Sequence, residues 1–410
     1  MLSISNGATG KDAGDGGLVM VNGRVYRPPH RPSVVVCIDG CDPSYLDDAF
    51  ERDLIPRIAE LVQQGALVEA RSQMPSFTNP NNVSIVTGLT PAGHGISGNH
   101  VLGDDGQEHP LTDPADLRAE TIPNAFHAAG IPVLVVTVKN KLRRLLAAPG
   151  VPCVSVERAE LHDIRLGTTI EKLMGRPVPG VYEWECSPYA LELGLVLAKR
   201  LGSMLTYVSL TDYVQHAHPP GSAVSDAYLA ALDHAVGAYL DAGFDVALVA
   251  DHGMNDKTNR DGSPNVRYLA DELEGEVRDA HVVLPITDPH VIHHAALGSC
   301  AWVYLPAPER ERARDLLGSL PGVEDVLERE SAARLLSLPA DRIGDLVVLA
   351  DRSTVLGRRE GEHDLSALVG RLRSHGGRHE QAVPLLLSVP LRRSARGRTN
   401  ADVHDLLLNA

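Results

Sequence analysis

The sequence predicts an α/β protein with a doubly wound, mostly parallel sheet and helices on both of its faces. Continuous runs of β-branched and aliphatic residues, which are typical of strands buried on both faces, alternate with helical segments. This alternation favours parallel strands joined by right-handed crossover helices. A change to short strands after about residue 258 predicts a second, smaller α+β part.

The predicted elements of the first part follow one another in strand–helix order. The first strand, Ser33–Asp39, is a β-branched run that ends in an Asp-Gly turn signal. The first helix, Leu54–Gln64, carries its apolar residues at helical spacing on one face. The same reasoning predicts strand Ala66–Ala70, helix Asn81–Thr87, strand Val133–Thr137, helix Tyr189–Leu201, strand Leu205–Leu210, helix Ser225–Ala242 and strand Asp245–Ala250.

The later part of the chain predicts a cap inserted into the core. We expect residues 20–257 and 371–410 to form the core, 258–370 the cap, and 1–19 a disordered leader rich in Gly, Ser and Asp. The elements predicted here are strands Val282–Leu284, Ala301–Leu305, Val323–Leu327 and Leu346–Ala350, helices Arg310–Leu317 and Leu365–Leu372, and a last buried strand, Val383–Val389.

Composition and charge narrow the classes of function. The 410 residues include 38 Lys+Arg against 53 Asp+Glu, a net charge of −15, which argues against general nucleic-acid binding. The five cysteines are scattered, and we find no secretory signal and no apolar stretch approaching the ~20 residues that span a bilayer. We therefore expect a cytoplasmic protein with no membrane contact, and base rates favour a homodimer.

Three aspartates share one kind of position, directly after a predicted strand. They are Asp39, Asp212 and Asp251. In open α/β sheets the ligand crevice lies at the carboxyl ends of the strands, where three carboxylates would repel one another unless cations neutralise them. Each aspartate alone would be an ordinary helix cap or turn residue. Together they predict a metal site.

Histidines stand where further metal ligands are needed. His216 follows Asp212 by four residues, His252 is adjacent to Asp251, and His375 lies in a Gly-rich turn before the last strand. Carboxylate and imidazole ligands together suit a zinc-like ion, whereas carboxylates alone would suit Mg²⁺ or Ca²⁺.

Thr78 precedes an apolar helical stretch, in the segment PSFTNPNN. Its hydroxyl could serve simply as a helix cap, or as a nucleophile at a helix N-terminus, where an anion is favoured. A nearby metal would activate it, because a metal lowers the pKa of bound water from about 15.7 to about 7 and acts on an alcohol in the same way.

Two lysines offer positive charge for an anionic substrate. Lys139 and Lys141 follow the strand-like run VLVVTV, so their alternate side chains are expected to point the same way. A solvated basic patch with Arg143 and Arg144 is an equally strong interpretation from the residues alone.

These residues together resemble the alkaline phosphatase superfamily, whose two-metal site matches, in order, Asp39, Thr78, Asp212-x-x-x-His216, Asp251-His252 and His375. The stretch TPAGHGISGN is similar to its nucleotide pyrophosphatase/phosphodiesterase-like branch. Within that branch, CIDGCDPSYL, PSFTNPNNVSIVTG, VKNKLRRLL and RSHGGRHEQAVPLL resemble the phosphonoacetate hydrolases. The resemblance runs from about Arg31 to Pro390.

The resemblance implies an alkaline phosphatase-like core that binds two zinc ions, with iron or manganese as substitutes. One ion would be held by Asp212, His216 and His375, and the other by Asp39, Asp251, His252 and the Thr78 hydroxyl.

The resemblance also implies hydrolysis of the C–P bond of phosphonoacetate to acetate and phosphate, through a phospho-threonine at Thr78. Asn99 would hydrogen-bond a phosphonyl oxygen, while Lys139 and Lys141 would hold the substrate carboxylate. The lysines would then also stabilise the enediolate-like leaving group.

Other functions remain in competition. A phosphodiesterase or nucleotide pyrophosphatase could use the same site, but it would need an apolar or aromatic slot rather than a lysine pair. A non-catalytic metal- or anion-binding protein would leave Thr78 unexplained. The segment from Cys41 to Tyr45 is similar to the C-x-P-S-R signature of sulfatases, but Tyr45 replaces its arginine.

From the cap, we expect contributions to the site from among Asp288, His290, His293 and His294.

Overall fold

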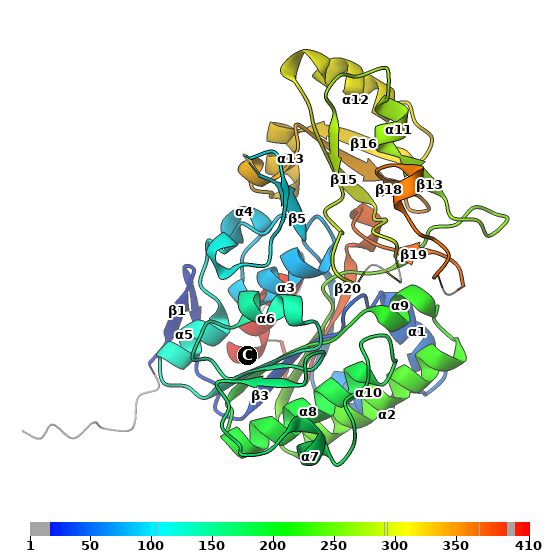
Figure 1. Cartoon of the computed structure of the whole chain (residues 1–410). Helices are drawn as coiled ribbons and strands as arrows, with labels where there is room; N and C mark the ends of the chain where they lie inside the picture. Colours follow the sequence, from blue (N-terminus) through cyan, green and yellow to red (C-terminus); the bar gives the residue numbers. More distant parts are fainter. Residues whose placement is uncertain (1–16, 104, 291, 293, 369, 392–397) are drawn as a thin grey trace, which may run out of the picture.

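The structure is a computed structural model that describes residues 17–103, 105–290, 292, 294–368, 370–391 and 398–410. Two parts are visible in Figure 1, a larger one below and a smaller one above. Residues 1–16 of the predicted leader lie outside the described residues, and Val19 already belongs to β1 (Val19–Val21), which pairs with β2 (Arg24–Tyr26).

The larger part is built on a sheet of eight strands. From edge to edge these are β4 (Ala66–Arg71), β20 (Ala382–Leu387), β11 (Asp245–Val249), β3 (Ser33–Cys37), β10 (Leu205–Ser209), β7 (Val133–Thr137), β8 (Cys153–Ser155) and β9 (Glu160–His162). The strands from β11 to β8 run parallel, while β20 against β11, β4 against β20 and β9 against β8 are antiparallel. The mostly parallel α/β sheet predicted from the sequence is confirmed.

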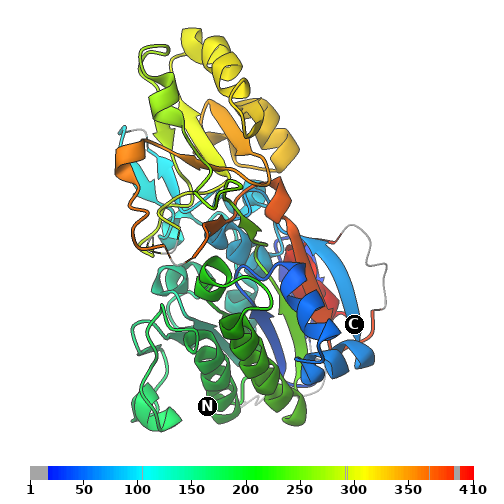
Figure 2. The ribbon, with the colours of Figure 1, turned by 90° about the vertical axis from the view of Figure 1, so that its right-hand side faces the viewer.

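Helices cover both faces of this sheet (Figures 1 and 2). One layer contains α2 (Pro56–Gln64), α8 (Cys186–Leu201) and α10 (Ala223–Asp241), and the opposite one contains α3 (Thr78–Thr87), α5 (Ile122–Ala128), α6 (Asn140–Leu146) and α14 (Val403–Leu408). The β-branched interior of β3, β7 and β10 is buried from end to end because both faces are covered.

The smaller part is an insert with its own core around the buried Trp302. Its antiparallel sheet has the order β14 (His281–Val283), β15 (Cys300–Tyr304), β17 (Leu346–Ala350) and β16 (Val323–Glu328), and α11 (Leu269–Leu273), α12 (Arg310–Gly318) and α13 (Arg329–Leu336) accompany it. Next to the ends of the predicted cap, β12 (Asn255–Asp256) pairs with β19 (Arg373–Ser374).

The remaining elements are short: α1 (Pro43–Glu51), α4 (Pro91–His94), β5 (His100–Leu102), β6 (Glu108–Pro110), α7 (Ile170–Met174), α9 (Tyr213–Ala217), β13 (Val266–Tyr268) and β18 (Val355–Gly357). Within the described ranges no helix combines the length and the apolar character needed to cross a membrane. All five cysteines are buried and free.

One predicted helix is wrong. The described residues of Leu365–Leu372 form turns and loop rather than a helix. The apolar spacing that suggested a helix has another cause, because Leu365, Leu368 and Leu372 contact the small core cluster around Leu297 and Val355. Gly370 has a φ of +72°, which interrupts a right-handed helix.

Candidate active site

Three buried carboxylates meet at the carboxyl ends of the central parallel strands. The strands β11, β3 and β10 are neighbours, run parallel and end at Val249, Cys37 and Ser209. Asp251, Asp39 and Asp212 follow these ends within three residues, and all three are buried. The three aspartates that follow predicted strands therefore lie next to one another in the fold.

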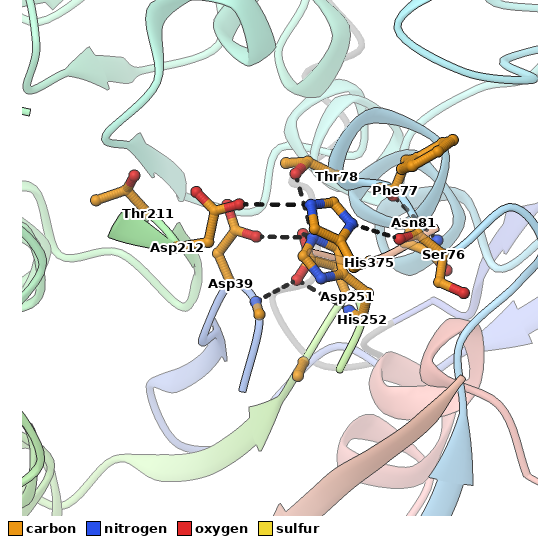
Figure 3. Close-up of polar contacts among 12 residues, drawn as sticks. Asp39, Ser76, Phe77, Thr78, Asn81, Thr211, Asp212, Asp251, His252 and His375 are labelled. Atoms are coloured by element: carbon orange, nitrogen blue, oxygen red, sulfur yellow. Dashed lines mark hydrogen bonds and ion pairs between the residues drawn. The ribbon is translucent and has the colours of Figure 1, made fainter. Parts of the chain in front are cut away.

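The first cluster contains Asp39, Asp251 and His252, whose ligand atoms lie within 4.8 Å of one another. Nε2 of His252 is 3.2 Å from Oδ1 of Asp39 and 3.9 Å from Oδ2 of Asp251 (Figure 3). Asp251 is fixed by two backbone donors, since its Oδ1 accepts the N–H groups of Gly40 and of His252 at 3.1 Å. The family resemblance assigned these three side chains, with the Thr78 hydroxyl, to one ion.

The second cluster lies beside the first. The ligand atoms of Asp212, His252 and His375 are within 4.8 Å of one another, so His252 belongs to both clusters. The rings of His252 and His375 stack with centroids 3.6 Å apart and an interplanar angle of 6°. His216 joins them, because its Nε2 lies 3.2 Å from Oδ2 of Asp212. The structure thus brings together all six predicted aspartate and histidine ligands.

Backbone carbonyls orient the three imidazoles. Nδ1 of His216 lies 2.7 Å from the carbonyl oxygen of Arg373, and Nδ1 of His375 lies 2.7 Å from that of Ser76. Nδ1 of His252 lies 3.0 Å from the carbonyl oxygen of Gly253. Because Nδ1 is used in this way, each Nε2 is left to face the carboxylates, as in metal sites that hold histidine through its outer nitrogen.

Burial and neighbouring charges shift the pKa values of two side chains in these clusters, Asp251 and His375. Burial, reinforced by the charge of Asp39, raises the pKa of Asp251 to about 7. Burial, together with the nearby His252 and His216, lowers the pKa of His375 well below its usual range. His375 is therefore neutral, which is the form that ligates a metal.

The donor set fits metal ions. Three carboxylates and three imidazoles, all buried, converge in two adjacent clusters. Buried carboxylates this close together are costly unless cations neutralise them, and nitrogen and oxygen donors of this kind suit zinc, iron or manganese. These groups fit a two-metal site.

Thr78 is the first residue of α3, whose ten residues are all buried. Its Oγ1 lies 3.4 Å from Nε2 of His252, so the hydroxyl faces the first cluster (Figure 3). Phe77 rather than Thr78 occupies the N-cap position, and its side chain makes no capping bond. The interpretation of Thr78 as a simple helix cap is therefore wrong, and the hydroxyl sits at a helix N-terminus beside the candidate metal ligands.

Asn82 is a supporting residue that the sequence reasoning missed. Its Nδ2 donates to Oδ2 of Asp251 at 2.9 Å and to the carbonyl oxygen of Thr78 at 3.1 Å, while the hydroxyl of Tyr207 donates to its Oδ1 at 2.8 Å. The available signal was its spacing, because residues four apart on a helix share a face. Asn82 thereby connects the helix of Thr78 to a candidate metal ligand.

Lys139 is buried inside the carboxylate cluster. Its Nζ lies 2.8 Å from Oδ2 of Asp39 and 2.7 Å from Oδ1 of Asp212, and 2% of its side chain is exposed. Burial would lower the pKa of Lys139, but Asp212 and Asp39 hold it well above the usual value. Lys139 is thus a charged group that neutralises part of the cluster, and it is not part of a solvated patch.

Lys141 points elsewhere. The strand ends at Thr137 and α6 begins at Asn140, so the expected strand-like alternation of the two lysines is wrong. The Lys141 ammonium forms a buried ion pair with Asp288 of the insert, with 5% and 7% of the two side chains exposed. The two lysines nevertheless share an electrostatic partner, because the negative charge of Asp288 interacts with both ammonium groups.

Asn99 contacts the insert, and two of the predicted cap residues, His290 and His294, contact the core. The side chain of Asn99 is buried, and its Nδ2 donates to the carbonyl oxygen of Ile286 at 2.9 Å. Nε2 of His290 lies 3.4 Å from Glu157, and the ring of His294 lies 5.3 Å from that of His216. His293 lies outside the described residues.

A small cavity of about 140 Å³ adjoins His216. Tyr182 and Tyr213 of the core and Ile292 and Leu368 line part of it. Thr78, Lys139 and Asn99 do not line this cavity, so it lies beside the candidate site rather than at the Thr78 hydroxyl.

Comparison with known proteins agrees with this site. The type I phosphodiesterase / nucleotide pyrophosphatase family matches residues 33–380. Phosphonoacetate hydrolase from Sinorhizobium meliloti 1021, in crystal structures with phosphonoformate and with phosphonoacetate, is 40% identical, with 97% of this chain and 99% of that chain covered and a TM-score of 0.91. Murine ectonucleotide pyrophosphatase / phosphodiesterase 5 is 18% identical, with 92% and 94% covered and a TM-score of 0.63, and shows the fold alone.

The chain belongs to the type I phosphodiesterase / nucleotide pyrophosphatase family of the alkaline phosphatase superfamily. Within that family it is an enzyme homologous to phosphonoacetate hydrolase over nearly its full length.

Proposed function

We propose that this enzyme hydrolyses the C–P bond of phosphonoacetate to acetate and phosphate. The observation that carries the proposal is the Thr78 hydroxyl at a helix N-terminus, 3.4 Å from His252, with the buried Lys139 ammonium on two carboxylates of the same cluster. The 40% identity to an enzyme named for this reaction, over 97% of the chain, supports the substrate.

Two metal ions would complete the site. Asp39, Asp251 and His252 would hold one, with Thr78 beside it, and the other would be held by Asp212, His216 and His375. When bound, such ions supply Lewis-acid stabilisation of phosphoryl oxygens and favour the ionised form of a nearby hydroxyl. Zinc is the proposed metal, and iron and manganese suit the same donors.

Thr78 is the proposed nucleophile. The hydroxyl proton passes to solvent, Oγ1 forms a bond to phosphorus while the C–P bond breaks, and the electron pair of that bond passes to the leaving carbon and its carboxylate. A proton from solvent then gives acetate, and water hydrolyses the phospho-threonine to phosphate. Fixing Thr78 on a fully buried helix holds the attacking oxygen in place and lowers the entropic cost of the step.

The lysines are proposed to act on the carboxylate of the substrate. Loss of the phosphoryl group leaves an enediolate-like anion, and an ammonium group directed at its oxygen stabilises that charge more than the ground state. In this structure Lys139 balances Asp39 and Asp212. If those aspartates held metal ions, its ammonium would be available to the substrate carboxylate. Asn99 is proposed to donate to a phosphonyl oxygen.

A phosphodiesterase or nucleotide pyrophosphatase activity is the second candidate. The family match and the Tyr182–Tyr213 ring pair beside the small cavity favour it. The buried Lys139 ammonium favours the smaller carboxylated substrate.

Phosphate release tests the two candidates directly. Phosphonoacetate and a nucleotide diester should be assayed with the purified protein, then again after removal of metals by a chelator and after zinc is restored. We expect phosphate from phosphonoacetate, loss of that activity on chelation and recovery with zinc. Turnover of the diester alone, or activity that survives complete metal removal, would contradict the proposal.

A further inference from the structure

A short segment of the insert is attached to the core beside the substrate-binding residues. The segment, residues 285–290, is called here the crossing segment. The backbone N–H of Asn99 donates to the carbonyl oxygen of Pro285 at 2.7 Å, and Nδ1 of His100 lies 2.7 Å from that of Thr287. Together with the bond from Asn99 to Ile286, these contacts fix the segment against the part of the core that carries Asn99.

Within the crossing segment, Asp288 contacts Lys141, which is proposed to bind the substrate. One of its carboxylate oxygens, Oδ2, accepts a hydrogen bond from the ammonium of Lys141, and both side chains are almost completely buried. In the described part of the chain, Asp288 is the one recorded hydrogen-bond partner of that ammonium. A buried cation without a partner would be unstable, so the position of Lys141 depends on Asp288.

Asp288 is itself held in place. Its other oxygen, Oδ1, accepts the backbone N–H of His290 at 2.6 Å, and Nε2 of His294 lies 3.9 Å from the same atom. Burial would raise the pKa of Asp288, but the charges of Lys141, His294 and Lys139 lower it far below its ordinary value. The carboxylate is therefore a fixed negative charge rather than a mobile side chain.

We propose that Asp288 is a positioning residue that sets the place of the Lys141 ammonium for the carboxylate of the substrate. The inference rests on the proposed function, because it deepens the role given there to Lys141. A lysine ammonium has three donors, so one can remain on Asp288 while the others face a second carboxylate. The insert thus contributes to specificity through a core lysine rather than by touching the substrate.

The alternative is that the ion pair only joins the insert to the core. The two roles predict different ligand dependence. A positioning role concerns ligands that carry a carboxylate, whereas a purely structural role would change the binding of every ligand of the site. Phosphonoformate, the ligand of the Sinorhizobium meliloti complex, carries a carboxylate, and inorganic phosphate does not.

The experiment measures the affinity of the purified, metal-loaded protein for phosphonoformate and for phosphate by calorimetry. Asp288→Asn keeps the size of the side chain and the acceptor for His290 but removes the charge. We expect about tenfold weaker binding of phosphonoformate and a change of less than about twofold for phosphate. Asp341→Asn is the matched control, because it removes the charge of a different ion pair between the insert and the core, that of Asp341 with Arg118, and it should leave both affinities unchanged.

A double-mutant cycle identifies the route of the effect. Lys141→Met should weaken phosphonoformate binding at least as much as Asp288→Asn, and the double variant should bind like Lys141→Met alone. Asp288→Glu, which keeps the charge but moves it, provides a folded second variant and should also weaken phosphonoformate selectively.

Several results would overturn the inference. They are an unchanged or tighter affinity of Asp288→Asn for phosphonoformate, an equal loss for phosphate, or an effect that persists in the Lys141→Met background. Wild-type protein that binds phosphonoformate no better than phosphate would instead contradict the proposed function, and the inference would fall with it.

Discussion

The side-chain amide of Asn82 donates a 2.9 Å hydrogen bond to Oδ2 of Asp251. Both side chains are fully buried, and Asn82 lies one helical turn after Thr78. The contact ties the helix that carries the proposed nucleophile to a proposed metal ligand, so the two should respond together to substitution.

Replacing Asn82 by leucine should therefore weaken metal binding. Outer partners of metal ligands typically contribute about 10- to 100-fold in affinity or activity, and we expect a loss of zinc affinity in that range. Competition with a chromophoric chelator measures it. Tyr207→Phe is the matched control, because it removes the donor to Asn82 but keeps the bond to Asp251, and it should lose less. Equal zinc affinity of Asn82→Leu and wild type would contradict this prediction.

Removing the hydroxyl of residue 78 should abolish turnover without releasing metal. We expect Thr78→Ala to lower kcat by at least about 10³-fold, because no other group replaces a covalent nucleophile, while Thr78→Ser keeps measurable activity. Phosphate release and metal content should be measured on the same preparations. A Thr78→Ala protein with normal metal content and full turnover would exclude Thr78 as the nucleophile.

Lys139→Met should destabilise the metal-free protein more than the metal-loaded protein. Without the ammonium, Asp39 and Asp212 lose a buried partner, which typically costs roughly 3–5 kcal/mol, and bound cations would restore part of that loss. Thermal unfolding with chelator and with zinc measures the difference. Lys199→Met, at an exposed position on α8, should change neither melting temperature. A Tm loss of Lys139→Met that is the same in both conditions would be the contrary result.

The buried His404 should make the protein sensitive to acid. Burial lowers the pKa of His404 to about 4, so the folded state holds it neutral where the unfolded state already binds a proton. Stability from this group is present above about pH 6.5 and is lost as the pH falls toward 4. Between pH 7 and pH 4, His404→Gln should lose roughly 3 kcal/mol less unfolding free energy than wild type. Parallel urea curves at both pH values check this, and identical pH dependence of the two proteins would refute it.

The part of the site that the sequence predicted best is the set of aspartates. The runs that became β3, β10 and β11 are buried on both faces, and the rule that ligands bind at the carboxyl ends of parallel strands places Asp39, Asp212 and Asp251 together. The local sequence pattern was sufficient to place these aspartates together, because the carboxyl ends of neighbouring parallel strands lie side by side.

The partners of the lysines could not be predicted in the same way. Local pattern did not show that α6 begins at Asn140, so the direction of Lys141 was misjudged. Its ion pair with Asp288 joins residues that are 147 positions apart, and such a contact depends on how the insert lies against the core. The false helix at Leu365–Leu372 has a similar cause, because its leucines contact loop residues around Leu297.

The most direct test of the whole account is anomalous scattering from crystals of the zinc-loaded protein. Two strong peaks are expected, one among Asp39, Asp251 and His252 and the other beside Asp212, His216 and His375. Crystals that show no anomalous peak at these six side chains, although the same preparation releases phosphate from phosphonoacetate, would contradict the account.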